Sequence, residues 1–329
     1  MKKQQIYRYT GNPAQLFGLR RVQLQEGRAA GVNVIEAHTA GDLQVDILPD
    51  TGLDLGLVRF KGKNVSFQSK NGYDSLAANA HNTEFLQTFP GGLLYTCGLR
   101  SVGPANHDGG EWHPLHGRIH GLQAQEVCAY VDDDRLVVSG VLRETALFGH
   151  ALQLRRTITL PVWDSRVIIE DCLENLTPKA EELMLLYHFN FGYPMLSEDA
   201  RLILPEQKKT TPRSEFAQTG IDRLLEFDPP VDGEEERVFF HEDMEPWARL
   251  ENPSLGISAA LRWSGDTLPI LAQWRSMASG DYVLGLEPTN SYIMGRSAER
   301  KNGTLQSLGA FESVQTRTEL SFEHMEATL

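Results

Sequence analysis

The strongest constraint on the fold is an alternation of apolar and polar residues with a period of two. Residues 43–47 place three aliphatic side chains on one side, and residues 152–160 and 166–173 form similar runs. Because successive side chains of a strand point to opposite faces, this pattern is typical of strands with one buried face. Turn sequences recur at short intervals, at residues 49–52, 61–64, 132–134, 264–266 and 301–303. The sequence therefore predicts many antiparallel strands.

Helical signals are sparse. Residues 74–89 are the one segment that reads as a helix, with Asp74 or Ser75 as the N-cap and a stop at Pro90. Alternating βαβ units are therefore not expected, and no repeat of about 40 to 50 residues marks propeller blades. With 329 residues, of which 41% are hydrophobic and 23% charged, the chain can bury a full-sized core. We expect an all-β protein, one large antiparallel β-sandwich domain over residues 1–329 with few short helices.

One long segment departs from this pattern. Residues 205–246 are polar and charged, and strand-like sequence resumes after them. This predicts long loops and suggests a wall around a site. The acidic run at residues 233–236 reads as solvated surface.

Charge and cysteine usage exclude several classes of partner. The net charge is −13, and no stripe of Lys and Arg is present, so nucleic acid and anionic membranes are poor partners. No secretion signal or membrane-spanning run is visible. Cys97, Cys128 and Cys172 are few and far apart, so neither a disulfide framework nor a CxxC site is suggested. We expect a cytoplasmic protein.

Histidines are concentrated in one loop-like segment, residues 107–120. His113, His116 and His120, with Glu111, could ligate a divalent metal, because imidazole and carboxylate suit Zn, Fe or Mn. Pro114 and Gly117 interrupt the segment, however, so the spacing does not imply that the three rings converge. The alternative is that one histidine contacts a sugar or transfers protons and the others are loop residues.

Two further residues stand out in apolar surroundings. His188 lies in the run 185–194, where a hydrogen-bonded core residue is the default interpretation. Burial holds an imidazole near neutrality, which also suits a proton donor or acceptor. Glu287 ends an apolar stretch before Pro288, and Glu is rarely buried without a partner. A structural salt bridge is the simpler explanation for it.

Three short elements, taken in order, resemble the aldose 1-epimerase (galactose mutarotase) superfamily, in its aldose-epimerase-like branch. Residues 114–117 (Pro-Leu-His-Gly) resemble the element that carries the first active-site histidine of that family. Residues 174–177 followed by 187–190 resemble the element with the second histidine, and residues 286–288 (Leu-Glu-Pro) resemble the element with the catalytic glutamate. The resemblance implies a many-stranded β-sandwich with a sugar cleft.

The resemblance also implies an activity, an isomerase that interconverts the anomers of an aldose or related sugar. Glu287 would be the base for the C1 hydroxyl, His188 the acid for the ring oxygen, and His116 a second donor. A base and an acid on opposite sides of one ring need no metal or nucleotide, so no cofactor is implied.

Substrate-binding residues are less clearly marked. The family arginine that precedes the first histidine has two candidates here, Arg100 and Arg118. Residues 50–56 resemble an early hairpin of the aldose-epimerase-like branch, from which Asp54 could reach a sugar, although turn formation is its first expected role. The family aspartate has Asp243 as its candidate. Side chains eligible to stack on a pyranose are Trp112, Trp274 and Tyr95.

Two other functions fit some of the same residues. The first is a metal-dependent sugar isomerase of the cupin type, which would use His107, His113, His116, His120 and Glu111. The second is a carbohydrate-binding protein without catalysis.

Overall fold

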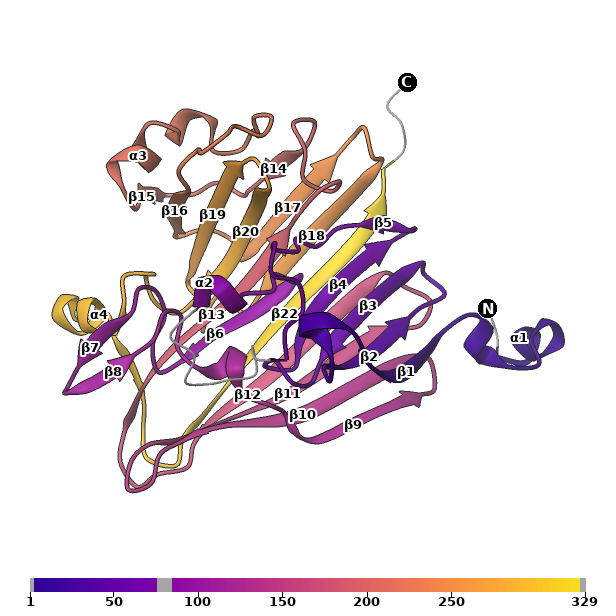
Figure 1. Cartoon of the computed structure of the whole chain (residues 1–329), viewed down its shortest axis with the longest axis horizontal. Helices are drawn as coiled ribbons and strands as arrows, with labels where there is room; N and C mark the ends of the chain where they lie inside the picture. Colours follow the sequence, from indigo (N-terminus) through magenta and orange to yellow (C-terminus); the bar gives the residue numbers. More distant parts are fainter. Residues whose placement is uncertain (1–2, 76–84, 326–329) are drawn as a thin grey trace.

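The computed structural model describes residues 3–75 and 85–325, and antiparallel sheets dominate it (Figure 1). The largest sheet has eight strands. In spatial order these are β14 (Arg201–Ile203), β17 (Trp247–Asn252), β18 (Ile257–Trp263), β22 (Ser313–His324), β12 (Arg166–Asn175), β11 (Ala151–Pro161), β10 (Arg135–Thr145) and β9 (Gln125–Asp132).

Two more sheets face this one across the core. A seven-stranded sheet contains β15 (Lys209–Pro212), β16 (Arg237–Glu242), β19 (Ile270–Ala278), β20 (Asp281–Thr289), β13 (Glu181–Phe191), β21 (Gln306–Leu308) and β6 (Leu94–Leu99), the last paired with β13. A five-stranded sheet contains β1 (Gly18–Gln23), β2 (Asn33–His38), β3 (Leu43–Leu48), β4 (Asp54–Phe60) and β5 (Lys63–Asn64). The two sheets abut where the Leu93 amide donates to the Gly56 carbonyl, 2.9 Å away.

The remaining elements are short. The hairpin of β7 (Asn106–Asp108) and β8 (Glu111–His113) lies beside α4 (Arg296–Asn302) (Figure 1). The other helices are α1 (Lys3–Tyr9), α2 (Phe85–Thr88) and α3 (Glu215–Gln218), and the 3-10 turns are η1 (Pro13–Gln15), η2 (Gly27–Ala29), η3 (Ile119–Gly121) and η4 (Ile221–Arg223). No helix in the described part of the chain is long and apolar enough to cross a membrane.

The core explains the alternation seen in the sequence. β12 alternates regularly between buried and less buried residues, because one of its faces packs into the core. β13 differs, since all but one of its residues are buried on one face or the other. The predicted all-β sandwich is confirmed, and β13 is the strand that separates the core from the site described below.

Two expectations about local structure need correction. Of the helix expected over residues 74–89, the structure describes only the last turn, Phe85–Thr88; Asp74 is not helical, and residues 76–84 lie outside the described residues. Residues 205–246 are not only loops, because they contain β15, α3 and β16.

A buried ionic network joins the sheets and gives Asp54 a structural position. Arg156 on β11 is completely buried, and its Nη1 lies 2.6 Å from Asp54 Oδ1 while its Nη2 lies 2.8 Å from Asp171 Oδ2. The Tyr187 hydroxyl donates to Asp171 (2.6 Å), and the Thr96 hydroxyl donates to Asp54 (2.6 Å). Burial raises the pKa of Asp54 to about 6, against the opposing effect of Arg156. The expectation that Asp54 reaches a sugar is wrong, because this network encloses its carboxylate.

Candidate functional site

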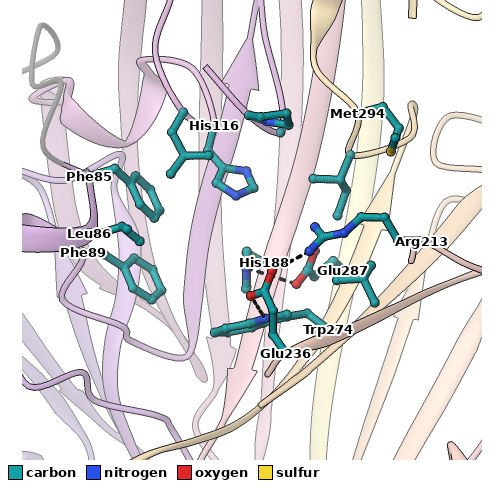
Figure 2. A pocket seen from close by; sticks show the side chains of 15 residues that line it. Phe85, Leu86, Phe89, His116, His188, Arg213, Glu236, Trp274, Glu287 and Met294 are labelled. Atoms are coloured by element: carbon teal, nitrogen blue, oxygen red, sulfur yellow. Dashed lines mark hydrogen bonds and ion pairs between the residues drawn. The ribbon is translucent and has the colours of Figure 1, made fainter. Parts of the chain in front are cut away.

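A cavity of about 480 Å³ opens above the seven-stranded sheet (Figure 2). Its polar lining consists of His116, His188, Arg213, Glu236, Trp274 and Glu287. The rest of the lining is apolar or backbone: Phe85, Leu86, Phe89, Gly103, Pro104, Leu115, Val238, Ile293 and Met294. A mostly apolar cavity of this size with a few convergent polar groups is typical of a small-molecule site.

His188 and Glu287 come together because neighbouring strands carry them. β13 and β20 pair antiparallel, with Phe189 opposite Leu286, so the next positions along bring His188 beside Glu287. His188 Nε2 lies 3.1 Å from Glu287 Oε1, and both side chains are buried. The contact is not aligned as a hydrogen bond, and both Glu287 oxygens and His188 Nδ1 lack a hydrogen-bond partner among the residues that the structure describes. These atoms are free to accept or donate a proton to a bound molecule.

Burial determines where protons reside in the empty cavity. It raises the pKa of Glu287 well above its usual value, with Arg213 opposing the rise and Glu236 adding to it. Burial, reinforced by His116, lowers the pKa of His188 to about 3. Burial likewise lowers the pKa of His116 to about 4. Both histidines are therefore neutral near pH 7, and Glu287 holds a proton more readily than an ordinary glutamate does. Perturbed, partner-free groups in a cavity are typical of proton-transfer sites.

His116 reaches this pair from a tight loop. Its φ is 59°, and its backbone amide donates to Gly103 O (2.9 Å) while its carbonyl accepts from the Gly98 amide (3.0 Å). A side chain at Gly117, which also has a positive φ of 78°, would place its Cβ 2.3 Å from Gly98 O. The loop thus requires glycine at position 117 and holds His116 with a positive φ. The centres of the His116 and His188 rings lie 6.0 Å apart.

An arginine, a glutamate and a tryptophan form the opposite polar edge (Figure 2). Arg213 Nη2 lies 2.5 Å from Glu236 Oε1, and Trp274 Nε1 donates to Glu236 Oε2 at 2.7 Å. The ring of Trp274 stands edge-on to His188, with centroids 5.1 Å apart. Neither Arg213 nor Glu236 was predicted from the sequence. Both lie in residues 205–246, however, which were expected to form a wall around a site.

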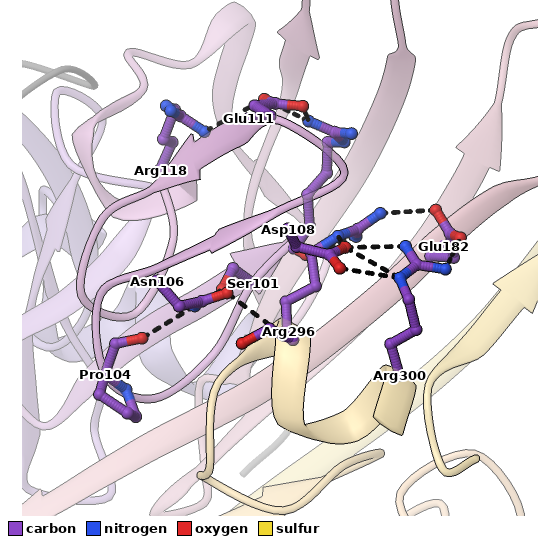
Figure 3. Close-up of polar contacts among 11 residues, drawn as sticks. Ser101, Pro104, Asn106, Asp108, Glu111, Arg118, Glu182, Arg296 and Arg300 are labelled. Carbon is purple, nitrogen blue, oxygen red and sulfur yellow. Dashed lines mark hydrogen bonds and ion pairs between the residues drawn. The ribbon is translucent and has the colours of Figure 1, made fainter. Parts of the chain in front are cut away.

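Arg100 and Arg118, the expected sugar-binding arginines, do not line the cavity. Arg100 Nη1 binds Glu111 Oε1 at 2.6 Å, and Arg118 Nη2 donates to the Trp112 carbonyl at 2.7 Å. Both belong to the polar contacts around the β7–β8 hairpin. Asp108 of the same hairpin binds Arg296 and Arg300 of α4 (Figure 3). Arg100 and Arg118 therefore stabilise the hairpin. The guanidinium group that lines the cavity belongs to Arg213.

The other sequence candidates lie away from the cavity lining. Trp112 packs against His107 with ring centroids 4.8 Å apart, and Tyr95 stacks beneath His120 at 4.8 Å. Asp243 is likewise absent from the lining. Within the described residues, no three His, Cys, Asp or Glu side chains are grouped so as to hold a metal ion. The metal site of the alternative cupin-type function, built from His107, His113, His116, His120 and Glu111, is therefore not formed among these residues.

Comparison with known proteins identifies the sequence family of this chain. A family profile described as a domain of unknown function (DUF4432) matches residues 29–322. The chain belongs to this family. No curated protein matches it significantly.

Solved structures show that this DUF4432 protein has the galactose mutarotase-like fold. A candidate aldose 1-epimerase from Klebsiella pneumoniae superposes with a TM-score of 0.87 at 22% identity, over 96% of this chain and 87% of that one. A galactose mutarotase-like protein from Clostridium acetobutylicum gives 0.67 at 16% identity, over 94% and 100%. Galactose 1-epimerase from Lactobacillus acidophilus gives 0.62 at 15% identity, over 94% and 100%. At sequence identities this low, the structural similarity shows a shared fold.

Gly285 keeps space open between the residues of the DUF4432 site. A methyl group there would lie 2.4 Å from Glu287 Oε1, 3.1 Å from Trp274 Cε3 and 3.2 Å from His188 Cε1. We expect Gly285→Ala to displace the Glu287 carboxyl and to lower the turnover of the site by roughly 10 to 100-fold, since a displacement near 1 Å can cost about 100-fold. Steady-state kinetics and thermal melting of the variant check this. Gly11→Ala is the control, because nothing lies within 4 Å of that added methyl group; equal activity of the two variants would contradict the expectation.

His120 should make the protein acid-sensitive. Its ring is buried against Tyr95, and burial, with a smaller effect of His116, lowers its pKa to about 3 from the usual 6.5. The unfolded chain binds this proton below about pH 6.5 and the folded chain does not, so stability falls as the pH falls from 6.5 towards 3. We expect His120→Phe to reduce the slope of unfolding free energy against pH by about 1.4 kcal/mol per unit between about pH 6 and 4. Urea titrations at several pH values measure the slope, and an unchanged slope would contradict this account.

Proposed function

We propose that this protein interconverts the anomers of an aldose by acid-base ring opening. The observation that carries the proposal is the buried pair of His188 and Glu287, whose Nε2 and Oε1 atoms lie 3.1 Å apart in a cavity that fits a small molecule. The galactose mutarotase-like fold and the structural similarity to galactose 1-epimerase from Lactobacillus acidophilus support it.

The reaction moves two protons and breaks one bond. The Glu287 carboxylate takes the proton of the C1 hydroxyl, the C1–O5 bond breaks, and O5 takes a proton from the His188 imidazolium, which leaves an open-chain aldehyde. Rotation about C1–C2 and the reverse steps give the other anomer. Glu287 and His188 share one proton throughout, so the pair returns to its starting state after each turnover. Each positioned group of this kind contributes about 10² to 10⁴-fold.

The empty cavity favours the shared proton on Glu287 rather than on His188, so ring opening begins only after this proton has moved to His188 across the 3.1 Å contact between Oε1 and Nε2. Ring closure then needs Glu287 to return the C1 hydroxyl proton to the aldehyde oxygen while His188 takes the proton of the O5 hydroxyl. His116, whose ring centre lies 6.0 Å from that of His188, would donate to the ring oxygen or to a hydroxyl. Trp274 lies beside His188 and offers an apolar surface for the pyranose.

Exchange spectroscopy on the purified protein tests the proposal. The NMR signals of the two anomers of each aldose in a panel are followed with and without the protein. We expect the protein to accelerate exchange of at least one aldose well above the rate in buffer. Sugar binding without accelerated exchange would instead identify a carbohydrate-binding protein.

A further inference from the structure

The cavity holds little positive charge for an anionic substrate. Among the described residues that line it, Arg213 is the single Lys or Arg, and Glu236 already binds it at 2.5 Å. Two positively charged side chains nearby, Arg237 and Arg275, bind other groups. Arg237 binds Glu234, and Arg275 Nη1 donates to the carbonyl of Arg223 (3.0 Å).

Glu236 is the residue that neutralises the cavity. One of its oxygens binds Arg213 and the other accepts the Trp274 indole N–H at 2.7 Å, so both oxygens are held in place. Its side chain is 47% exposed, which puts it at the solvent side of the site. Glu287 adds a second carboxyl group within the same cavity. A substrate carboxylate or phosphate would therefore meet a cation that is already paired, with two acidic groups nearby.

We infer that the site selects uncharged aldoses and that Glu236 is the residue that excludes uronic acids and sugar phosphates. This deepens the proposed function and rests on it. The exclusion acts by repulsion, because an anionic group near Glu236 faces a like charge and loses water without gaining a free cation. For an uncharged sugar the same pair is favourable. The guanidinium donates to hydroxyl oxygens, and the carboxylate accepts from hydroxyl protons.

The substitution Glu236→Gln removes the negative charge of this side chain and keeps its shape. The glutamine oxygen can still accept from Trp274, but Arg213 loses its ionic partner and becomes available to an anionic substrate. We expect the ratio of kcat/KM for D-glucuronate over D-glucose, and for D-galacturonate over D-galactose, to rise by at least about tenfold in this variant. Glucose 6-phosphate relative to glucose should shift in the same direction.

Two further variants show whether the effect is local. Glu235→Gln makes the same charge change one residue away, at an exposed position outside the cavity lining, and should leave the ratios at their wild-type values. The double variant Arg213→Gln with Glu236→Gln should lose the gain, because the freed cation is gone. A Glu236→Gln protein with unchanged ratios, or a wild-type protein that prefers the uronates, would overturn the inference.

Binding measurements separate this inference from the proposed function. Calorimetric titration of the same sugars gives the affinity ratios even if no aldose is exchanged. Absence of exchange with retained selection of neutral sugars would contradict the enzyme and support the charge selection. Exchange of neutral and acidic sugars alike would contradict the selection and support the enzyme.

Discussion

Replacing Arg156 by methionine should destabilise the protein by about 3 to 5 kcal/mol, the usual cost of removing one partner from a buried ion pair. Arg156 is the cation between Asp54 and Asp171, and all three side chains are essentially inaccessible to solvent. Without it the two carboxylates are left buried without a positive partner. The Thr96 and Tyr187 hydroxyls that bind them cannot supply that charge.

The adjacent arginine provides a matched control. Arg155 binds Glu174 on the sheet surface, and its side chain is 53% exposed. Arg155→Met makes the same substitution on the same strand and should change stability little, because solvent screens exposed pairs. Urea unfolding of both variants measures the difference. Similar stability of Arg156→Met and Arg155→Met would contradict the assigned role of the buried network.

Much of the fold was predictable because strand patterns are local. The period-two alternation in the sequence of β12 matches the alternation of buried and less buried residues along that strand. The apolar run of β13 reflects a strand that is covered on both faces. The His-Gly pair at residues 116 and 117 was also recognisable, since the tight loop needs a glycine there. His188 and Glu287 were found through short motifs, and β13–β20 pairing places them in contact.

Other parts of the site depend on long-range packing that single residues do not reveal. Arg213 and Glu236 lie in a polar segment without a motif, and they enter the cavity only because β15 and β16 form its edge. Arg100 precedes the first histidine and Arg118 follows it closely, but Glu111 and the Trp112 carbonyl hold them outside the cavity. Asp54 follows a turn motif, and its burial against Arg156 becomes visible only when the sheets are packed together.

Glu287→Gln should lose at least about 100-fold in anomer exchange while remaining folded. The change keeps the side chain's shape and removes the proton acceptor, and a general base contributes about 10² to 10⁴-fold. No hydrogen bond to the Glu287 oxygens is lost, because they have no hydrogen-bond partner in the described structure. Burial raises the pKa of Glu287, so a neutral amide there relieves a desolvation cost. The melting temperature should therefore stay the same or rise. His188→Gln should lose activity similarly.

The most direct test of the assigned chemistry is the anomer-exchange rate per folded molecule of Glu287→Gln, measured beside the wild type on the sugar that the wild type exchanges fastest. Thermal melting and a binding titration on the same preparation give the folded fraction and the sugar affinity. The account predicts a folded variant that binds the sugar and exchanges it at least about 100-fold more slowly. A stable, sugar-binding Glu287→Gln protein with the wild-type exchange rate would contradict it.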